Sequence, residues 1–245
     1  MRRVAAGCQP VFFSRAQGIA ELRLYTDFDG TVAQQDVTDA VLRRFAPEEW
    51  ESIESAWRSG EIDAAACMRA QIALIDASRA HLDAFLDQVE LDPGFPHFVA
   101  WCAEERVPLS IVSDGVDYFA KRILERHGLG HLPLFANHLR FEARRCALSH
   151  PWRAPECRAG AGVCKCVITA ADSTDETDLL VYVGDGRSDR CVATSADFLF
   201  AKDDLAAHCR SQRLPYFPFQ TFDQVRETLL TLDRRPKRRE DECLA

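Results

Sequence analysis

Three groups of polar side chains follow short apolar stretches, at points where buried strands are expected to end. The first group is the segment DFDGT at 27–31, which follows an apolar stretch at 22–25. Unpaired carboxylates at Asp27 and Asp29 would be costly there unless a cation or a ligand compensates them. Two such carboxylates can divide the chemistry of phosphoryl transfer, because one attacks phosphorus while the other moves protons. A polar Asp-Gly turn is the alternative interpretation.

Ser113, Asp114 and Gly115 follow a second apolar stretch, at 108–112. We expect a helix to begin directly after them, and the backbone amides at a helix N-terminus favour a bound phosphate. The Ser113 hydroxyl would donate a hydrogen bond to the same anion. A simple helix cap is the alternative, because Ser and Asp caps are frequent.

Asp185 and Asp189 follow a third apolar stretch, at 179–183. In proteins Mg²⁺ takes one or two carboxylates together with phosphate and water, and we expect Asp185 and Asp27 to supply them. A Gly-Asp-Gly turn with a capped helix is the alternative. Lys165 opens the helix before this strand, where a lysine opposes the helix dipole. That position is explained if its ammonium faces an anion and carboxylates; a solvated surface lysine is the alternative.

The elements that position these residues predict an α/β fold. Short strands alternate with helical patterns, which is typical of a Rossmann-like parallel sheet with helices on both faces and ligands beyond the strands' carboxyl ends. Between 34 and 91 the apolar residues recur at helical spacing without a strand signal, and Asp36 is placed to cap the first helix. We therefore expect a core of 21–33 and 92–232 and a small helical cap at 34–91. The cap would be a lid that selects substrate and excludes water, or else a bundle packed to one side.

Later segments carry weaker signals. Residues 134–150 alternate and predict one or two strands, followed by a loop at 151–162. Residues 1–20 resemble a weak transit peptide or a ragged extension, to which we assign no function, and the charged residues 233–245 predict a disordered tail. The net charge of -8 argues against a general nucleic-acid binder. No apolar run reaches the length of a bilayer span, so we expect a soluble protein without a membrane partner.

The ten cysteines are not spaced like those of a small secreted disulfide scaffold, which predicts a reducing, cytoplasmic setting. Four that fall within helical patterns are expected to be buried free thiols: Cys67, Cys102, Cys191 and Cys209. Five possible zinc ligands lie in or beside the loop before Lys165: Cys146, His150, Cys157, Cys164 and Cys166. Their spacing matches no recognised zinc motif, so we favour reduced thiols over a zinc site.

Taken together, these motifs resemble the haloacid dehalogenase superfamily of phosphohydrolases. The four motifs occur in the family's order: the segment 27–31, then Ser113, then Lys165, then Gly184-Asp185 with Asp189. The resemblance covers about 22–232, and the helical insertion resembles the family's cap in its first position. Dehalogenases lack the second aspartate of the first motif, so the resemblance favours the phosphatase and phosphotransferase branches.

The resemblance implies a role for each motif residue. Asp27 is implied to be the nucleophile that forms an aspartyl-phosphate. Asp29 is implied to be the general acid for the leaving oxygen and then the base for water. Mg²⁺ is the implied cofactor, held by Asp27, the main-chain carbonyl of Asp29, and Asp185. The implied phosphate-binding residues are Ser113, Asp114, Gly115 and Lys165. The implied supporting residues are Thr31, Asp36 and Asp189, of which Asp189 would orient the metal ligands and the lysine.

Further features resemble the phosphoserine-phosphatase-like branch of that superfamily. They are the acid at Asp36, the Ser-Asp-Gly at 113–115, the cysteine-bearing loop before Lys165, and the ending YFPFQTF at 216–222. Within the branch they are most similar to the methionine-salvage phosphatases that act on an enol phosphate, with phosphatases of phosphocholine and phosphoethanolamine as close relatives. The resemblance implies Mg²⁺-dependent hydrolysis of a small phosphate ester. A phosphotransferase and a catalytically idle phosphate-binding module are the alternatives.

Overall fold

The computed structural model describes residues 21–142, 145–157, 160–171 and 178–232. The predicted N-terminal extension and C-terminal tail lie outside these described residues. A seven-stranded sheet has the strand order β4-β3-β2-β1-β5-β6-β7. Every neighbouring pair is parallel except β3 and β4, which form an antiparallel hairpin. This arrangement confirms the predicted α/β fold.

The strands are β1 (Leu22–Thr26), β2 (Leu109–Val116), β3 (Leu134–Glu142), β4 (Arg145–Ser149), β5 (Leu179–Gly184), β6 (Phe198–Ala201) and β7 (Phe217–Pro218). Strand β5, beside the central β1, is a continuous run of apolar residues, and every residue of β5 is buried. A strand that is covered on both faces needs such a continuous apolar run.

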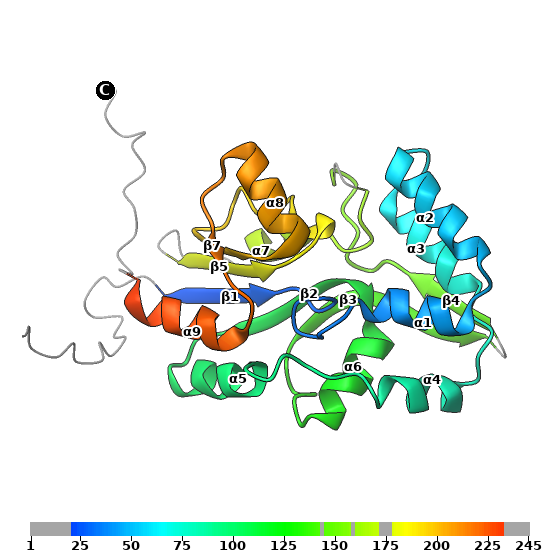
Figure 1. The fold of residues 1–245 in the computed structure, drawn as a ribbon, viewed down its shortest axis with the longest axis horizontal. Helices are drawn as coiled ribbons and strands as arrows, with labels where there is room; N and C mark the ends of the chain where they lie inside the picture. The colour runs from blue at the N-terminus through cyan, green and yellow to red at the C-terminus, as the bar shows by residue number, and fades with distance from the viewer. Residues whose placement is uncertain (1–20, 143–144, 158–159, 172–177, 233–245) are drawn as a thin grey trace, which may run out of the picture.

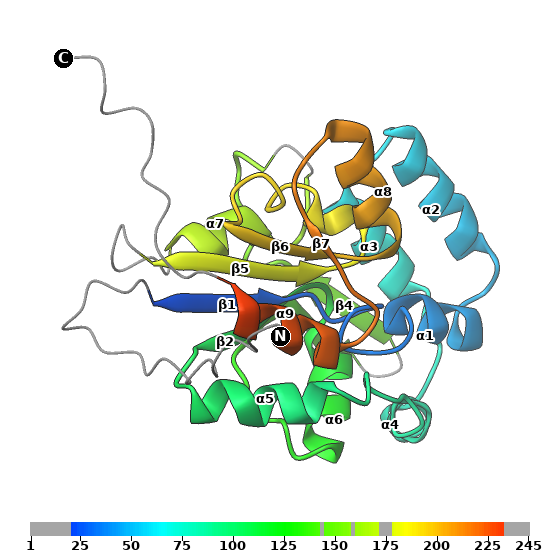
Figure 2. The same cartoon turned by 60° about the vertical axis from the view of Figure 1, so that its left-hand side comes forward.

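The helices are α1 (Val37–Phe45), α2 (Glu49–Ser59), α3 (Ala64–Ala73), α4 (Arg79–Leu86), α5 (Phe95–Glu104), α6 (Asp117–Arg126), α7 (Lys165–Ala171), α8 (Asp203–Gln212) and α9 (Phe222–Thr231). One face of the sheet is covered by α5, α6 and α9, and the other by α7 and α8 (Figure 1). Helices α1, α2 and α3 lie beyond the carboxyl ends of β1 and β5 in both views (Figures 1 and 2).

The segment 34–91, which we call the cap, begins and ends with local signals that the sequence carries. The Asp36 side chain accepts a hydrogen bond of 2.7 Å from the Asp39 amide and so caps α1, as predicted. Gly60 ends α2 in the left-handed conformation, with φ at 84°. An isolated bridge between Ala33 and Leu91 joins the chain where it enters and leaves the cap.

Two predicted boundaries were wrong. Strand β2 continues through Ser113 to Val116 instead of ending before the Ser-Asp-Gly, and α6 begins only at Asp117. The pairing with β3 shifts register between Val112 and Val116, which is the signature of a bulge. Asp189 lies in a short 3₁₀ turn, η2 (Arg187–Asp189).

Candidate active site

Asp27 lies directly beyond the end of β1, at the centre of the sheet's carboxyl edge. Its backbone amide still pairs with the carbonyl of Val183 on β5, at 2.9 Å, so its position is fixed by the sheet. The carboxylate is buried, and its Oδ1 accepts a hydrogen bond of 2.8 Å from the Phe28 amide. The same Oδ1 lies 2.9 Å from the Nζ of Lys165. One oxygen is thereby held in place at a point where parallel strands bind ligands.

Asp29 connects the beginning of the cap with β2. Its Oδ1 accepts from the Val37 amide at 2.9 Å, and its Oδ2 accepts from the Ser113 hydroxyl at 3.3 Å. A Cβ atom at Gly115 would lie 2.1 Å from that Oδ2, so only glycine leaves room for the carboxylate. Burial raises the pKa of Asp29, and the hydrogen bonds from Val37 and Ser113 offset part of this effect.

Lys165 is fully buried, which excludes the solvated surface lysine. Its Nζ lies 2.6 Å from the Oδ1 of Asp189 in addition to its contact with Asp27. Burial alone would lower the pKa of Lys165, but the carboxylates of Asp189 and Asp27 more than offset it and raise that pKa. The lysine therefore carries its positive charge beside the predicted nucleophile.

Asp189 holds this ammonium in place. Its Oδ1 also accepts a hydrogen bond of 2.6 Å from the hydroxyl of Tyr182. Its Oδ2 accepts from the backbone amides of Asp185 and Gly186, at 3.1 and 3.0 Å. Both oxygens are thus occupied by donors from the protein, which fits the supporting role implied for Asp189.

Asp185 directly follows β5, the strand that pairs with β1, and one of its oxygens lies within 4.8 Å of an oxygen of Asp27. The Thr31 hydroxyl donates to its Oδ1 at 2.6 Å. A Cβ atom at Gly30, whose φ is 70°, would lie 2.5 Å from the other oxygen, so glycine is required there for space and for conformation. Burial, and then the charge of Asp189, raise the pKa of Asp185 to about 6. The structure thus places Thr31, which the resemblance implied to be a supporting residue, in direct contact with Asp185.

The carboxylates at this edge form the one group of acidic, histidine or cysteine ligands in the described chain that is close enough to hold a metal ion. Oxygens of Asp27, Asp185 and Asp189 lie within 4.8 Å of one another. Burial and the charge of Asp189 raise the pKa of Asp27, although Lys165 opposes them. Three carboxylates facing one ammonium leave a surplus of negative charge, and a divalent cation neutralises it. Because Asp189 is already occupied by donors, Asp27 and Asp185 fit Mg²⁺ best.

Asp114, which was expected to bind phosphate, forms hydrogen bonds with neighbouring parts of the core. Its Oδ1 accepts from the Val163 amide at 3.0 Å, and its carbonyl accepts from the Asn137 side chain at 2.6 Å. Burial raises the pKa of Asp114. The residue therefore ties β2 to the loop that leads into α7, in addition to facing the cleft.

The cleft above the aspartates is lined from both sides. A cavity of about 180 Å³ has Asp27, Asp29, Ser113 and Asp185 at its base, and Asp36, Thr38, Glu54, Trp57, Met68 and Gln71 among its cap-side lining. A larger cavity of about 570 Å³ shares Trp57, Asp114, Arg187 and Ser188 with it. The guanidinium of Arg187 lies 4.9 Å from the ring centre of Trp57, so α2 of the cap contacts η2 of the core there.

Several of these residues were missed in the sequence. In the sequence, Tyr182 is recognisable only as part of the apolar strand at 179–183. Nothing in that segment indicates that its hydroxyl donates a hydrogen bond to Asp189. Asn137, fully buried within β3, carries a usable signal because a buried amide needs partners. The Trp57–Arg187 contact joins distant parts of the chain and has no local signal.

The cysteine predictions need two corrections. Cys191 does not lie in a helix, since it follows η2 in a turn and is half-buried. Cys146 belongs to β4 and packs into the main apolar core, away from the loop cysteines with which it was grouped. All the cysteines in the described ranges are free thiols, and within those ranges no set of three Cys or His ligand atoms converges as a zinc site requires.

Residues 24–194 match the family of haloacid dehalogenase-like hydrolases. The chain belongs to this family. It is 32% identical over 208 residues to a 2-hydroxy-3-keto-5-methylthiopentenyl-1-phosphate phosphatase of Brevibacillus brevis, covering 84% of this chain and 93% of the relative. It is also 32% identical to a phosphatase with the same name from Geobacillus kaustophilus, covering 87% and 97% of the two chains. These relatives confirm the predicted family, and the chain is a phosphatase of the haloacid dehalogenase type.

The fold has solved counterparts. A phosphoserine phosphatase carrying an analogue of its phospho-aspartyl intermediate superposes with a TM-score of 0.62, at 17% identity, over 86% of this chain and 99% of the other. The likeness confirms the phosphoserine-phosphatase-like architecture. Among the described helices, none is long and apolar enough to cross a bilayer.

Proposed function

We propose that the chain hydrolyses a small phosphate monoester with the help of Mg²⁺, through an aspartyl-phosphate at Asp27. The observation that carries this proposal is the placement of the Asp27 carboxylate between a buried, charged Lys165 and the carboxylate of Asp185. A carboxylate held by one oxygen keeps the other oxygen for attack on phosphorus. Mg²⁺ bound by Asp27 and Asp185 would supply the charge that lets an anionic nucleophile approach an anionic phosphate.

The protein's own residues would carry the remaining steps. Lys165 and Ser113 bind oxygens of the phosphoryl group and orient it toward Asp27. Asp29, whose raised pKa favours the protonated form, gives its proton to the leaving oxygen. As a carboxylate it then takes a proton from the water that attacks the phosphorus of the aspartyl-phosphate. The Val37 amide keeps Asp29 oriented through both steps.

We propose the methionine-salvage enol phosphate as the first candidate substrate. The sequence relatives that share about a third of their residues with this chain are named for that activity. The cap side of the cleft also supplies Trp57 and Met68, an aromatic ring and a thioether. Such side chains suit the apolar, sulfur-bearing tail of that substrate, because sulfur makes favourable contacts with aromatic rings.

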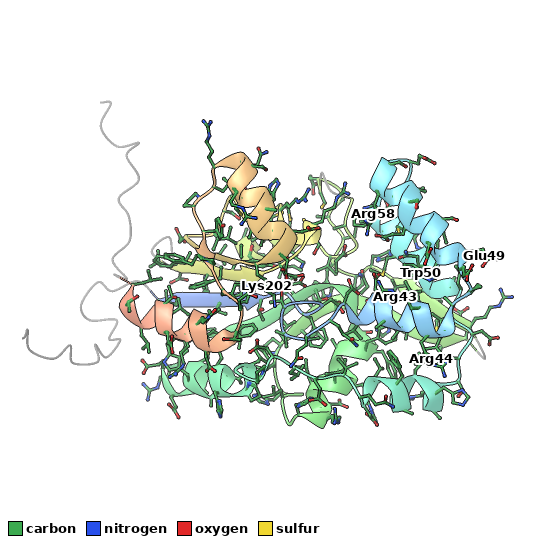
Figure 3. The ribbon with its side chains drawn as sticks, viewed as in Figure 1. Arg43, Arg44, Glu49, Trp50, Arg58 and Lys202 are labelled. Carbon is green, nitrogen blue, oxygen red and sulfur yellow. The ribbon has the colours of Figure 1, made fainter. Side chains whose placement is uncertain are left out.

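Phosphocholine or phosphoethanolamine is the second candidate, and the charge of the cleft favours it. Asp36, Asp39, Glu54 and Asp114 all line the cleft beyond the catalytic aspartates. Two of them are balanced within the cap: Asp39 pairs with Arg43 at 2.9 Å and Glu54 with Arg58 at 3.1 Å. Figure 3 shows these arginines on α1 and α2. Burial raises the pKa of the remaining acids, Asp36 and Asp114, and a leaving group that carries an ammonium would favour their ionised forms.

Phosphate release from a panel of phosphomonoesters tests the proposal and separates the candidates. The panel contains the salvage enol phosphate, phosphocholine, phosphoethanolamine and phosphoserine, each with Mg²⁺ or with a chelator. We expect metal-dependent release from wild type and a loss of roughly four orders of magnitude or more in Asp27→Asn. The substrate with the highest kcat/KM identifies the leaving group.

Asp87→Asn is the matched control, because Asp87 pairs with Arg122 between α4 and α6 and lines neither cavity. It should retain the turnover of wild type. Undiminished turnover in Asp27→Asn, or in chelator, would contradict the proposed mechanism. Transfer of phosphate to an added alcohol in preference to water would identify a phosphotransferase instead.

A further inference from the structure

Four cysteines that the catalytic scheme does not use gather beside Lys165. Cys164 and Cys166 flank the lysine at the start of α7, and their sulfur atoms lie 3.9 Å apart. The Cys164 side chain also interacts with that of Cys157 in the preceding loop. The Cys166 side chain interacts with that of Cys191, which comes from the turn after η2. The four thiols thus form a continuous chain of contacts between two elements of the active site.

The Cys166–Cys191 pair has the arrangement of a reactive dithiol. The thiol and the backbone amide of Cys166 both interact with the sulfur of Cys191, whose own thiol donates to the Ser188 carbonyl at 3.7 Å. Such donors stabilise a thiolate, which is the form of cysteine that attacks disulfides. The partner thiol that would resolve a mixed disulfide is therefore already in contact with the attacking sulfur.

Small molecules have a route to these thiols. Cys191 and Cys157 line the cavity of about 570 Å³ that adjoins the catalytic cleft through Arg187 and Ser188. Cys164, by contrast, is buried and does not line either cavity. An oxidant that enters this cavity can therefore reach Cys191, whereas Cys166 does not line either cavity.

We propose that Cys166 and Cys191 form a redox-modification site that a low-molecular-weight disulfide converts into an intramolecular disulfide, and that this bond lowers phosphatase turnover. The second half of the proposal rests on the proposed function, whereas the first half does not. The Cys191 thiolate attacks one sulfur of the disulfide, forming a mixed disulfide and releasing one thiolate of the reagent. The deprotonated Cys166 then attacks the sulfur of Cys191 and releases the second thiolate. Two protein thiols are oxidised, and one reagent disulfide is reduced to two thiols.

The position of this bond explains its effect on turnover. Cys166 is the residue after Lys165, and Cys191 lies two residues beyond Asp189. A covalent bond would pull together the two segments that hold the 2.6 Å contact between the Lys165 ammonium and the Asp189 carboxylate. A catalytic group displaced by about 1 Å can cost roughly 10²-fold in rate. We therefore expect oxidation to lower kcat by about tenfold or more.

Oxidised glutathione is the probe for the test, applied to the full chain in the presence of Mg²⁺. Digestion without reductant, followed by mass spectrometry, should reveal peptides containing Cys166 and Cys191 joined and lighter by two hydrogens. Release of phosphate from para-nitrophenyl phosphate should fall in parallel and return when dithiothreitol is added. Cys191→Ser should keep its own untreated rate after glutathione treatment, whereas Cys166→Ser should stop at the mixed disulfide and yield a Cys191 peptide that carries one glutathionyl group. Cys102→Ala, at a buried thiol of α5, is the control and should respond as wild type does.

Three outcomes would overturn the proposal. The first is alkylation of both thiols after glutathione treatment, with no joined peptide. The second is a joined peptide with unchanged turnover. The third is one equivalent of Zn²⁺ bound through these cysteines, which would make the cluster a metal site. Because peptide mapping needs no activity, a protein inactive on every phosphate ester would refute the proposed function while leaving the dithiol chemistry measurable.

Discussion

Lys165 shows how a single buried charge organises the site. Its ammonium lies between Asp27 and Asp189 and is fully buried, so each group's charge is stable only because the others are present. The contact between Lys165 and Asp27 stabilises the folded site and also places a positive charge beside the nucleophile. The lysine is therefore part of the structure and of the chemistry at once.

Lys165→Met should affect both properties. Removing the ammonium leaves two buried carboxylates without their cation, and breaking such a pair costs roughly 3–5 kcal/mol of unfolding free energy. Denaturant unfolding measures this loss, and phosphate release should also fall. Lys121→Met is the matched control, because the Lys121 side chain is 57% exposed in its pair with Asp117 and should contribute less than about 1 kcal/mol. Equal stability losses in the two variants would contradict the account.

The role of Asp29 as general acid predicts that its loss affects esters with different leaving groups to different degrees. A general acid matters most when the leaving oxygen is basic, and such catalysis contributes about 10²–10⁴-fold. Asp29→Asn should therefore slow the release of an alkyl alcohol far more than that of para-nitrophenol. The ratio of kcat/KM for the two esters is the measurement. An equal loss of kcat/KM for both esters would show that Asp29 is not the general acid.

The contacts between elements explain what the sequence revealed and what it did not. The motifs at Asp27 and Asp185 were predictable because each follows an apolar strand, and parallel strands bring such ends together. The true end of β2 was not predictable from Ser113, Asp114 and Gly115, because those residue types are typical of a turn. The sheet overrides that preference by pairing β2 with β3 beyond a bulge.

The cap was predictable as a set of helices, but its contact with the core was not. Amphipathic spacing and the Asp36 cap are local signals, and they reproduce the start of α1 at Val37. The partner of Trp57 is Arg187, and no local pattern joins α2 with η2. Tyr182 was missed for the same reason, since only the fold brings its hydroxyl to Asp189.

Trp57→Ala tests the contact between the cap and the core. Loss of the ring removes a cation–π contact of about 0.5–1 kcal/mol and part of the cleft wall. We expect the KM for the preferred substrate to rise several-fold, with a smaller effect on inhibition by inorganic phosphate. Trp57→Phe should recover most of the loss, and Trp152→Ala, at an exposed loop tryptophan, should behave as wild type. An unchanged KM in Trp57→Ala would place substrate selection elsewhere.

For the molecule as a whole, the site sets how stability depends on pH. Burial raises the pKa of Asp27 and Asp29, and burial with the charge of Asp189 raises that of Asp185 to about 6. A carboxyl group with a raised folded-state pKa contributes stability that is present below its unfolded pKa of about 4 and is lost as pH rises through the folded value. The metal-free protein should therefore lose stability from these groups as pH rises from about 4 to above 6.

Thermal unfolding with and without Mg²⁺ measures this dependence. We expect the Tm of the chelator-treated protein to fall between about pH 5 and pH 7.5, and Mg²⁺ to raise Tm more at the higher pH, because protons compete with the metal for the carboxylates. Asp185→Asn should flatten both effects. A Tm increase from Mg²⁺ that is the same at both pH values would contradict a metal site built from these aspartates.

Peptide mapping of a trapped intermediate shows whether Asp27 accepts the phosphoryl group. Asp29→Asn protein is mixed with Mg²⁺ and para-nitrophenyl phosphate, whose leaving group needs no acid, and is then quenched in acid. Without the base at Asp29, the intermediate should accumulate, and mass spectrometry should find one phosphoryl group on Asp27. Release of para-nitrophenol with the phosphoryl group on another residue, or with no phosphopeptide at all, would contradict the account.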